Sequence, residues 1–257
     1  MKYSTQLITR NRTYRPLAPI GQVLHCTDDL GATAQDEHDN FNDNDTGGIA
    51  AHTFTDANEI INTVPFNEQA QHAGAYANTH FIGNELCMPK IHDPVMFKAI
   101  WDNGVQLFAD ISIEQIHTYV VTPDNLLSHA EVSVRWHQST HQDPVVYFAE
   151  YGKTVDDFRT DVQNELCARL ANALAAKGWS NSPTYWMAVF AGAKVFDLTN
   201  FTMLLRNITG CSVTSTIVAA LLSHGWCSSP DYWTNVLQGK QTPNMAYVIK
   251  LLGNAVK

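Results

Sequence analysis

A short stretch between residues 127 and 147 concentrates side chains that bind metal ions. It contains His129, His137, His141 and Asp143, whereas the whole chain of 257 residues has only 11 histidines. Imidazole nitrogens and carboxylate oxygens are both good zinc ligands, and a catalytic zinc ion typically takes three protein ligands and leaves a fourth position open. The stretch therefore predicts part of a metal site, with two ligands or three, and any remaining ligand must come from elsewhere in the chain.

Two local features indicate how such ligands are presented. Asp143 precedes Pro144, and a proline disfavours the helical conformation in the residue before it. We therefore expect Asp143 at the end of an element or in a loop, with its carboxylate free to point into a cleft. Upstream, the run GQVL at residues 21–24 predicts a strand that ends at His25. The carboxyl ends of strands are where open α/β sheets place their chemistry.

Glu85 is the third candidate for chemistry. It lies in the apolar run FIGNELC at residues 81–87, which predicts a short strand. A carboxylate in such a strand either faces water at the edge of a sheet or acts as a catalytic group. The residues alone leave both interpretations open.

The elements that must position these groups alternate between strands and helices. This alternation predicts an α/β domain with a mixed central sheet flanked by helices. We expect an irregular lead-in at 1–20, a loop-rich stretch with at most one helical turn at 28–48, two strands joined by a turn at 49–65, a helix within 93–121 and an amphipathic helix at 154–177.

The C-terminal third contains two copies of one sequence unit. LAAKGWSNSPTYWMAVFAG begins at residue 174, and LLSHGWCSSPDYWTNVLQG begins 47 residues later. Each copy predicts a turn, a helix that opens after the proline and a second apolar helix. Two copies suit a binding module in which each copy offers the same pocket, although the aromatic residues, Trp179 and Trp226 above all, can instead fill a small core. The candidate binding residues are Trp179, Tyr185, Trp186, Trp226, Tyr232 and Trp233.

The predicted domain organisation follows from these patterns. We expect a catalytic domain at 1–153, a connecting helix at 154–172 and an all-α domain of two tandem repeats at 173–257. The net charge of −9 and the pI near 5.6 argue against nucleic acid as a partner. No apolar run approaches the roughly 18 residues needed to span a bilayer. The five cysteines form no C-x-x-C motif and are expected to be buried thiols.

Several separated motifs, in order, resemble the zinc-dependent N-acetylmuramoyl-L-alanine amidases of type 2, a family that includes peptidoglycan recognition proteins. The resemblance covers roughly Tyr14 to Tyr147. The motifs are VLHCT around His25, AAHTFTDANEIINTVP from Ala50, EQAQHAG around His72, HFIGNELC around Glu85, LSHAEV around His129 and THQDP around Asp143.

The resemblance implies a role for each of the clustered residues. His25, His129 and Asp143 are the implied ligands of one zinc ion, and Glu85 is the implied catalytic acid. His141 stands where many members have lysine, and it can donate a hydrogen bond to the oxyanion. Because the ordinary pKa of histidine is about 6.5, we expect the activity to be more pH-sensitive than in a lysine-bearing relative.

The sequence also suggests roles for three other residues in these motifs. His72 is expected to line the cleft or to support a metal ligand, although a purely structural role is also open. Asn84 replaces a common isoleucine and is expected to affect only local packing. Ala51 stands where some members have a tyrosine near the metal, so any such role falls to Glu85.

With its repeats and without a secretory signal segment, the chain looks like a bacteriophage or prophage endolysin. The implied reaction cuts the amide bond between N-acetylmuramic acid and L-alanine in the peptidoglycan of a Gram-positive host. We expect synthesis in the host cytoplasm, release by a holin-type route, and a wall carbohydrate as the partner of the repeats. Because the chain is acidic, wall binding should rest on apolar and hydrogen-bond contacts and depend weakly on salt. The oligomeric state is left open.

Two other functions remain as alternatives. Non-catalytic peptidoglycan-binding proteins of this family lack a zinc ligand, whereas all three implied ligands are present here. A zinc peptidase acting on wall peptides is the second alternative, and the absence of an H-E-x-x-H motif argues against its commonest form.

Overall fold

The computed structural model describes residues 2–257, which form two compact units. The first unit comprises the chain up to His117 together with Val121–Val162. The second comprises Thr118–Val120 and Gln163–Lys257. The division falls inside one long helix, α6 (Val155–Ala176), within the segment assigned from the sequence to a connecting helix.

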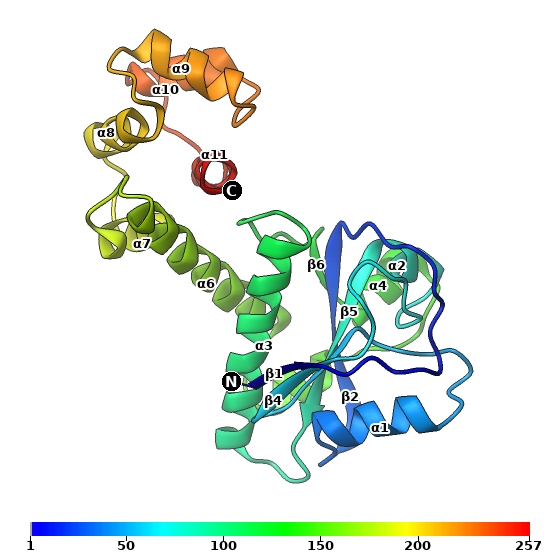
Figure 1. Ribbon diagram of the computed structural model, residues 1–257. Coiled ribbons are helices and arrows are strands. Elements are labelled where there is room, and N and C mark those ends of the chain that lie inside the picture. The colour runs from blue at the N-terminus through cyan, green and yellow to red at the C-terminus, as the bar shows by residue number, and fades with distance from the viewer. Residues whose placement is uncertain (1) are drawn as a thin grey trace. The chain divides into compact units, whose positions relative to one another are not determined.

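The first unit is built on a six-stranded mixed sheet in the order β1-β4-β3-β5-β2-β6 (Figure 1). All neighbouring strands run parallel except β3 and β4, which form an antiparallel hairpin. The sheet and its flanking helices confirm the predicted α/β architecture. The strands are β1 (Lys2–Thr5), β2 (Gly21–Leu30), β3 (Thr53–Thr55), β4 (Glu59–Asn62), β5 (Phe81–Met88) and β6 (Leu126–Ser128).

Helices cover both faces of this sheet (Figure 1). Because side chains alternate along a strand, Phe81 of β5 packs on one face with Ala77 and Val132, while Ile82 packs on the other with Leu107. Helices α2 and α4 therefore lie on the first face and α3 on the second. The helices of this unit before α6 are α1 (Ala34–Asp43), α2 (Ala75–His80), α3 (Pro94–Glu114), α4 (His129–Trp136) and α5 (Val145–Glu150).

Two predictions for the N-terminal part are wrong. The lead-in contains strand β1, which pairs in parallel with β4, and the loop-rich stretch contains the ten-residue helix α1. Strand β1 lies at the edge of the sheet with mostly exposed side chains, so it lacks an apolar pattern. Helix α1 is polar because only Ala34 and Glu37 of its ten residues are buried, and it is held by a reciprocal capping box between Thr33 and Asp36.

Asn84 does more than fill space, which corrects the expectation from the sequence. Its Oδ1 accepts a hydrogen bond from Thr53 Oγ1 at 2.8 Å, and its Nδ2 donates to Gln22 Oε1 at 3.2 Å. Gln22 Nε2 in turn donates to Ser112 Oγ at 3.1 Å. All four residues are buried. Because a buried polar group is costly unless it is paired, this network specifies how β3, β5, β2 and α3 fit together.

The second unit is entirely helical in its described elements. It contains the C-terminal part of α6 followed by five helices, and α7 and α10 each begin at a proline, 47 positions apart. Helix α9 lies 47 positions after the last ten residues of α6, so each copy of the sequence unit has three helices rather than the two predicted. The additional helices are α7 (Pro183–Phe190), α8 (Leu198–Thr209), α9 (Thr214–Ser223), α10 (Pro230–Leu237) and α11 (Met245–Val256).

The tryptophans of the second unit fall into two classes. Trp186 and Trp233 are each only 4% exposed, whereas Trp179 and Trp226 are partly exposed. The alternative that Trp179 and Trp226 fill a small core is therefore wrong. Trp186 and Trp233 are the tryptophans that lie in the core. Trp186 and Trp233 lie on the inner faces of α7 and α10, while the other two lie on the turns before these helices.

Two smaller expectations have mixed outcomes. Cys26, Cys87 and Cys167 are buried free thiols, as predicted, but Cys211 and Cys227 are only half-buried. Within residues 2–257 no single helix is long and apolar enough to cross a membrane, although the bent pair α8 and α9 meets the length and composition criteria jointly.

Candidate active site

Three neighbouring strands place candidate catalytic and metal-binding residues side by side. His25 on β2 pairs in register with Glu85 on β5, and Leu24 pairs with Ser128 on β6, directly before His129. His25 lies in the middle of a ten-residue strand rather than at its end. Glu85 lies in an interior strand, which excludes the interpretation as an edge residue facing water. His129 is the first residue of α4 and directly follows β6.

Local hydrogen bonds hold His129 and Asp143 in place. Ser128 caps α4 in a capping box, in which its Oγ accepts from Glu131 N at 3.2 Å and its backbone N donates to Glu131 Oε2 at 2.8 Å. Ala130 N donates to the carbonyl oxygen of Asp143 at 3.2 Å, so the loop carrying Asp143 is fastened to the start of the same helix. Asp143 thus occupies the loop position before α5 that the following proline predicted.

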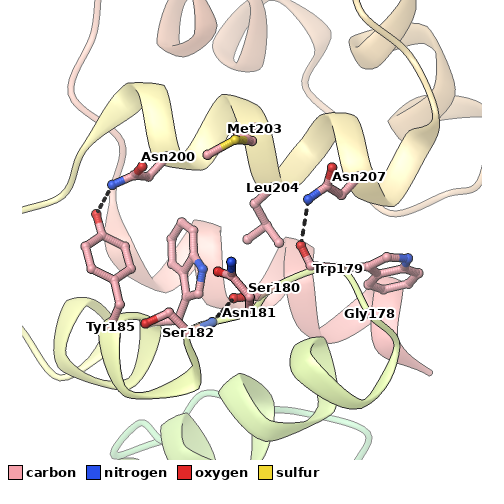
Figure 2. Close-up of a pocket in the computed structure, with 11 residues that line it drawn as sticks. Gly178, Trp179, Ser180, Asn181, Ser182, Tyr185, Asn200, Met203, Leu204 and Asn207 are labelled. Atoms are coloured by element: carbon pink, nitrogen blue, oxygen red, sulfur yellow. Dashed lines mark hydrogen bonds between the residues drawn. The ribbon is translucent and has the colours of Figure 1, made fainter.

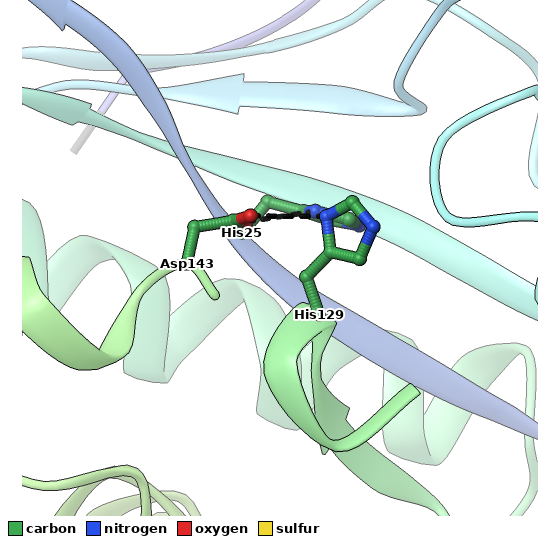
Figure 3. Close-up of side chains that lie close together, drawn as sticks. All are labelled: His25, His129 and Asp143. Carbon is green, nitrogen blue, oxygen red and sulfur yellow. Dashed lines mark hydrogen bonds and ion pairs between the residues drawn. The ribbon is translucent and has the colours of Figure 1, made fainter. Parts of the chain in front are cut away.

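His25, His129 and Asp143 form a compact cluster with the geometry of a metal site (Figure 3). His25 Nδ1 lies 3.1 Å from Asp143 Oδ2, and His129 Nδ1 lies 3.0 Å from Asp143 Oδ1. One ligand atom from each residue lies within 4.8 Å of the other two. Two imidazole nitrogens and a carboxylate oxygen are a suitable donor set for a single divalent transition metal ion.

Electrostatics favours the protonation states that a metal ion needs. Burial lowers the pKa of His25, so its ring is held neutral. Burial alone would raise the pKa of Asp143, but its close contacts with His129 and His25 outweigh this effect and hold that pKa well below its usual range. Neutral imidazoles and an ionised carboxylate are the forms that bind metal.

A chain of hydrogen bonds behind the cluster fixes the tautomer of His25. His72 Nε2 lies 3.2 Å from the carbonyl oxygen of Phe81, which can only accept, so His72 carries its proton on Nε2. His72 Nδ1 therefore accepts from His25 Nε2 at 3.0 Å, and His25 Nδ1 is left with a lone pair toward the metal position. Burial lowers the pKa of His72 well below its ordinary value, which keeps this arrangement neutral. His72 thus contacts the ring of His25 and lines the cleft.

Gly83 and Ser139 complete the site and were not identified from the sequence. A Cβ atom at Gly83 would lie 2.4 Å from the ring of His72, so only glycine lets that ring lie against β5. The signal was present, because a glycine inside a strand often marks a close approach. Ser139 Oγ lies 2.8 Å from His129 Nε2 and fixes that ring in the same way. No pattern pointed to Ser139.

Glu85 faces the cluster from β5. Its Oε1 lies 4.0 Å from His25 Nδ1, and its buried Oε2 has no hydrogen-bond partner among the described residues. Burial, reinforced by the negative charge of Asp143, raises the pKa of Glu85 well above its ordinary value. An unpaired buried carboxylate oxygen calls for an additional polar partner in the cleft, which is consistent with a site that binds metal, water and substrate.

His141 lies at the rim of the same cleft. Its side chain is 71% exposed, and its Nδ1 lies 3.8 Å from Asp143 Oδ1. Its ring stacks on His129 at a centroid distance of 4.9 Å, and Ser133 Oγ donates to its carbonyl oxygen at 2.9 Å. His137, the neighbour most easily mistaken for a ligand, is exposed at the C-terminal end of α4 and does not line the cleft.

The metal cluster opens into a cleft of about 570 Å³. His72, Glu85 and His141 line it together with the three candidate ligands. Apolar walls come from Met88, Val146 and Tyr147. The cleft is large enough for a small organic group and combines apolar walls with a few converging polar atoms, as ligand sites do.

The predicted binding residues of the C-terminal copies lie apart from this cleft, in the second unit. They line two separate pockets, each with one aromatic triplet. The first pocket is lined by Trp179, Tyr185 and Trp186, and the second by Trp226, Tyr232 and Trp233.

A sequence profile described as N-acetylmuramoyl-L-alanine amidase matches residues 15–146. Protein Ami of Listeria monocytogenes is 28% identical over 159 residues, which cover 60% of this chain and 17% of that protein. The bifunctional autolysin of Staphylococcus epidermidis is 31% identical over 141 residues, which cover 52% of this chain and 10% of the autolysin. The chain therefore spans less than a fifth of the length of these curated relatives.

Solved structures share the fold of the first unit. The Staphylococcus aureus hydrolase AmiA in complex with its ligand matches with a TM-score of 0.57 at 22% identity, over 65% of this chain and 83% of that one. The catalytic domain of XlyA matches with a TM-score of 0.51 at 22% identity, over 63% of this chain and 99% of that one. PlyL matches with a TM-score of 0.51 at 17% identity, over 63% and 97%. At these identities the likeness establishes a common fold.

Proposed function

The chain belongs to the N-acetylmuramoyl-L-alanine amidase family, and from this premise we propose that it hydrolyses the amide bond between N-acetylmuramic acid and L-alanine in peptidoglycan. The observation that carries the proposal is the convergence of His25, His129, Asp143 and Glu85 on one cleft. A non-catalytic recognition protein does not need a complete ligand set with a buried carboxylate beside it. Peptide-bond cleavage in the wall stem by the same groups is the remaining alternative.

We propose that the metal is a single zinc ion held by His25 Nδ1, His129 Nδ1 and one carboxylate oxygen of Asp143. The donor set fits zinc, and hydrogen bonds donated by His25 Nε2 to His72 and by His129 Nε2 to Ser139 leave the two Nδ1 lone pairs available. When bound, the ion polarises the scissile carbonyl and makes water in the cleft more acidic. The protein's contribution is to hold both rings and the carboxylate in position.

Glu85 is the group that moves the proton. Its unpaired Oε2 accepts a proton from the attacking water and returns it to the leaving amine of L-alanine. His141 at the rim donates a hydrogen bond from its ring to the oxyanion that develops on the carbonyl.

We further propose that the chain is a bacteriophage or prophage endolysin that acts on a Gram-positive wall after release from the cytoplasm. A mutant endolysin from Bacillus subtilis is among the proteins that share the fold, with a TM-score of 0.51. The curated relatives come from Listeria and Staphylococcus. The two aromatic pockets of the second unit support the wall as the partner of that unit.

The decisive experiment uses purified Gram-positive walls and follows the appearance of new L-alanine amines and of new reducing ends. We expect new amines without reducing ends, lost on chelation and restored by zinc. Glu85→Gln should lower the rate about 10²–10⁴-fold, whereas the exposed control Glu114→Gln should not change it. New amines from another stem residue would identify a peptidase. Bound zinc without cleavage of any wall in a panel would identify a binding protein.

A further inference from the structure

We propose that the second unit carries two equivalent saccharide-binding pockets, one in each 47-residue copy, and that each accepts one sugar residue of a wall glycan. The inference rests on the proposed function only for the source of the glycan. It goes beyond that function by assigning the ligand class, the number of sites and the residues that form them.

The two pockets are built from corresponding residues. Each is lined by eleven residues, and every residue of the first has its counterpart 47 positions later in the second. Seven of the eleven pairs are identical. The identical pairs are Gly178/Gly225, Trp179/Trp226, Ser182/Ser229, Tyr185/Tyr232, Trp186/Trp233, Leu204/Leu251 and Asn207/Asn254.

Identity between the copies is concentrated in these pockets. When residues 166–210 are compared with 213–257, only six of the 34 positions outside the pockets are identical. Folding accounts for most of those six, because Leu174, Val189 and Leu205 are buried with their counterparts and Pro183 opens a helix. The partly exposed tryptophan and tyrosine of the pockets, in contrast, are not part of the buried core. Their retention in both copies indicates a shared ligand.

The same hydrogen bond shapes both pockets. Asn207 Nδ2 donates to the carbonyl oxygen of Trp179 at 2.8 Å, and Asn254 Nδ2 donates to that of Trp226 at 3.3 Å. Figure 2 shows Asn207 of α8 reaching the turn that carries Trp179, with the pocket between the helix and the turn. A backbone carbonyl held by a side-chain amide fixes the turn, so the pocket wall is formed before a ligand arrives.

The aromatic walls are also fixed. The ring of Tyr185 lies nearly perpendicular to that of Trp186, at 87° and 5.1 Å, and Tyr232 meets Trp233 at 90° and 5.0 Å. The hydroxyl group of Tyr185 accepts a hydrogen bond from Asn200 Nδ2 at 3.0 Å (Figure 2). That of Tyr232 accepts one from a backbone N–H at 2.7 Å. Both tyrosines are thus anchored at each end by contacts of the same kind.

The lining of the pockets matches the chemistry of a sugar. A pyranose ring presents C–H groups on its faces and hydroxyl groups around its edge. Aromatic faces suit the former, and the serine and asparagine side chains of the first pocket suit the latter. No carboxylate lines either pocket among the described residues, and the only charged group is Lys250 in the second. The volumes, about 410 and 460 Å³, fall in the usual range of small-ligand sites.

Two like sites on one chain suit a polymer of repeating sugars. Once one pocket is occupied, binding at the other becomes intramolecular, and affinity for the polymer can exceed that of one site by about 10²–10⁴-fold. This avidity requires a glycan with closely spaced, similar residues. Both the peptidoglycan strands and the accessory polysaccharides of a wall meet that requirement.

The test measures binding of the full chain to purified walls, with Glu85→Gln present throughout to prevent digestion. Trp179→Ala and Trp226→Ala should each weaken binding by about 10²-fold, and the double variant should lose it. Trp179→Leu with Trp226→Leu keeps an apolar side chain at each position but removes the ring faces, and it should lose binding as well. The matched control is Phe196→Ala, which removes a half-buried aromatic residue outside both pockets.

Two wall preparations distinguish the sources of the sugar. Equal binding to intact walls and to walls stripped of accessory polymers by hydrofluoric acid assigns the glycan strand, and binding only to intact walls assigns an accessory polysaccharide. Wild-type binding by a folded double leucine variant would overturn the proposal, as would an equal loss in the Phe196→Ala control. Release of L-alanine amines by the parent chain is assayed separately, so a failure of the pockets and a failure of the amidase are distinguishable.

Discussion

The two units of the chain differ in charge and in how they use polar groups. The first carries 22 acidic and nine basic residues, a net charge of −13, whereas the second carries three acidic and seven basic residues, a net charge of +4. The first has one cleft with buried ionisable groups. The second has two half-open pockets lined almost wholly by neutral side chains. The chain's net charge of −9 therefore describes neither unit.

This contrast separates the demands of catalysis from those of binding. The groups at the metal site must be held in one protonation state, so they are buried and tied together by hydrogen bonds. The pockets need only shape, aromatic faces and neutral hydrogen bonds. Damage to one unit should therefore leave the function of the other intact.

The largest expected effect concerns the metal ligands. Asp143→Ala removes the carboxylate that both histidines contact, leaves two ligands for the ion, and should lower amidase activity by about 10³-fold or more because the water is no longer activated. Metal content by mass spectrometry should fall in parallel, while wall binding should not change. The exposed Asp124→Ala serves as control. Loss of wall binding in Asp143→Ala would contradict the separation of the units.

A smaller effect is expected behind the metal site. Gly83→Ala places a Cβ atom where the ring of His72 lies, so it should disrupt the support of His25 and lower metal affinity by about 10–100-fold. His72→Ala should have a similar effect. Because both act through one contact, the double variant should be little worse than either single variant. Titration with zinc measures all three, and additive losses would show that Gly83 acts otherwise.

Glu37 should make the stability of the first unit depend on pH. Burial, reinforced by Asp29, raises the pKa of this carboxyl from 4.5 to about 7. Because the folded pKa is above the unfolded one, the stabilisation of the protonated form is complete below about pH 4.5 and is lost as pH rises through 7. Glu37→Gln should remove this loss, which amounts to at most about 3 kcal/mol.

Thermal unfolding of the wild type and the Glu37→Gln variant at several pH values measures this difference. The variant should gain relative to the wild type between pH 5 and 8, since the pKa rises from 4.5 to about 7. The exposed Glu114→Gln should behave as wild type. A constant difference across that range would contradict the prediction.

A change of a few-fold is expected at the rim of the cleft. His141→Lys exchanges an imidazole for an amine, a group that stays charged at neutral and mildly alkaline pH. The exposed position leaves room for the longer side chain. The pH profile of amidase activity should extend further into the alkaline range. An unchanged profile would contradict the proposed role of His141 in stabilising the oxyanion.

The smallest expected effect is that of salt on wall binding. The first pocket has no charged lining residue among those described, and the second has one, so raising the ionic strength should change wall affinity by less than about threefold. The reason is the neutral lining and not the net charge of the chain, because the unit that binds is positively charged. A steep loss of affinity with salt would mean that the charge of the second unit, rather than its pockets, carries the interaction.

Sequence patterns predicted the helices and strands that have a regular pattern of apolar residues, and they missed those that lack one. The hairpin at residues 49–65, the long helix α3 and the helices opening at Pro183 and Pro230 follow from local patterns. Strand β1 was missed because it exposes most of its residues, and helix α1 because only two of its ten residues are buried. Helix α9, the counterpart of the end of α6, was missed because only Ala220 and Leu221 of its ten residues are identical to the residues 47 positions earlier.

By itself, the sequence determined which residue types are present for chemistry: histidines and an aspartate for a metal, a glutamate in an apolar strand, and a duplicated aromatic motif. These follow from composition and short-range spacing. Only the tertiary structure decided that His25, distant in sequence from Asp143, lies 3.1 Å from it. It also decided that His72, whose ring lies against Gly83, fixes the tautomer of His25. It further decided which tryptophans are buried and which are partly exposed. Such contacts arise from strand register and helix packing, which local sequence does not encode.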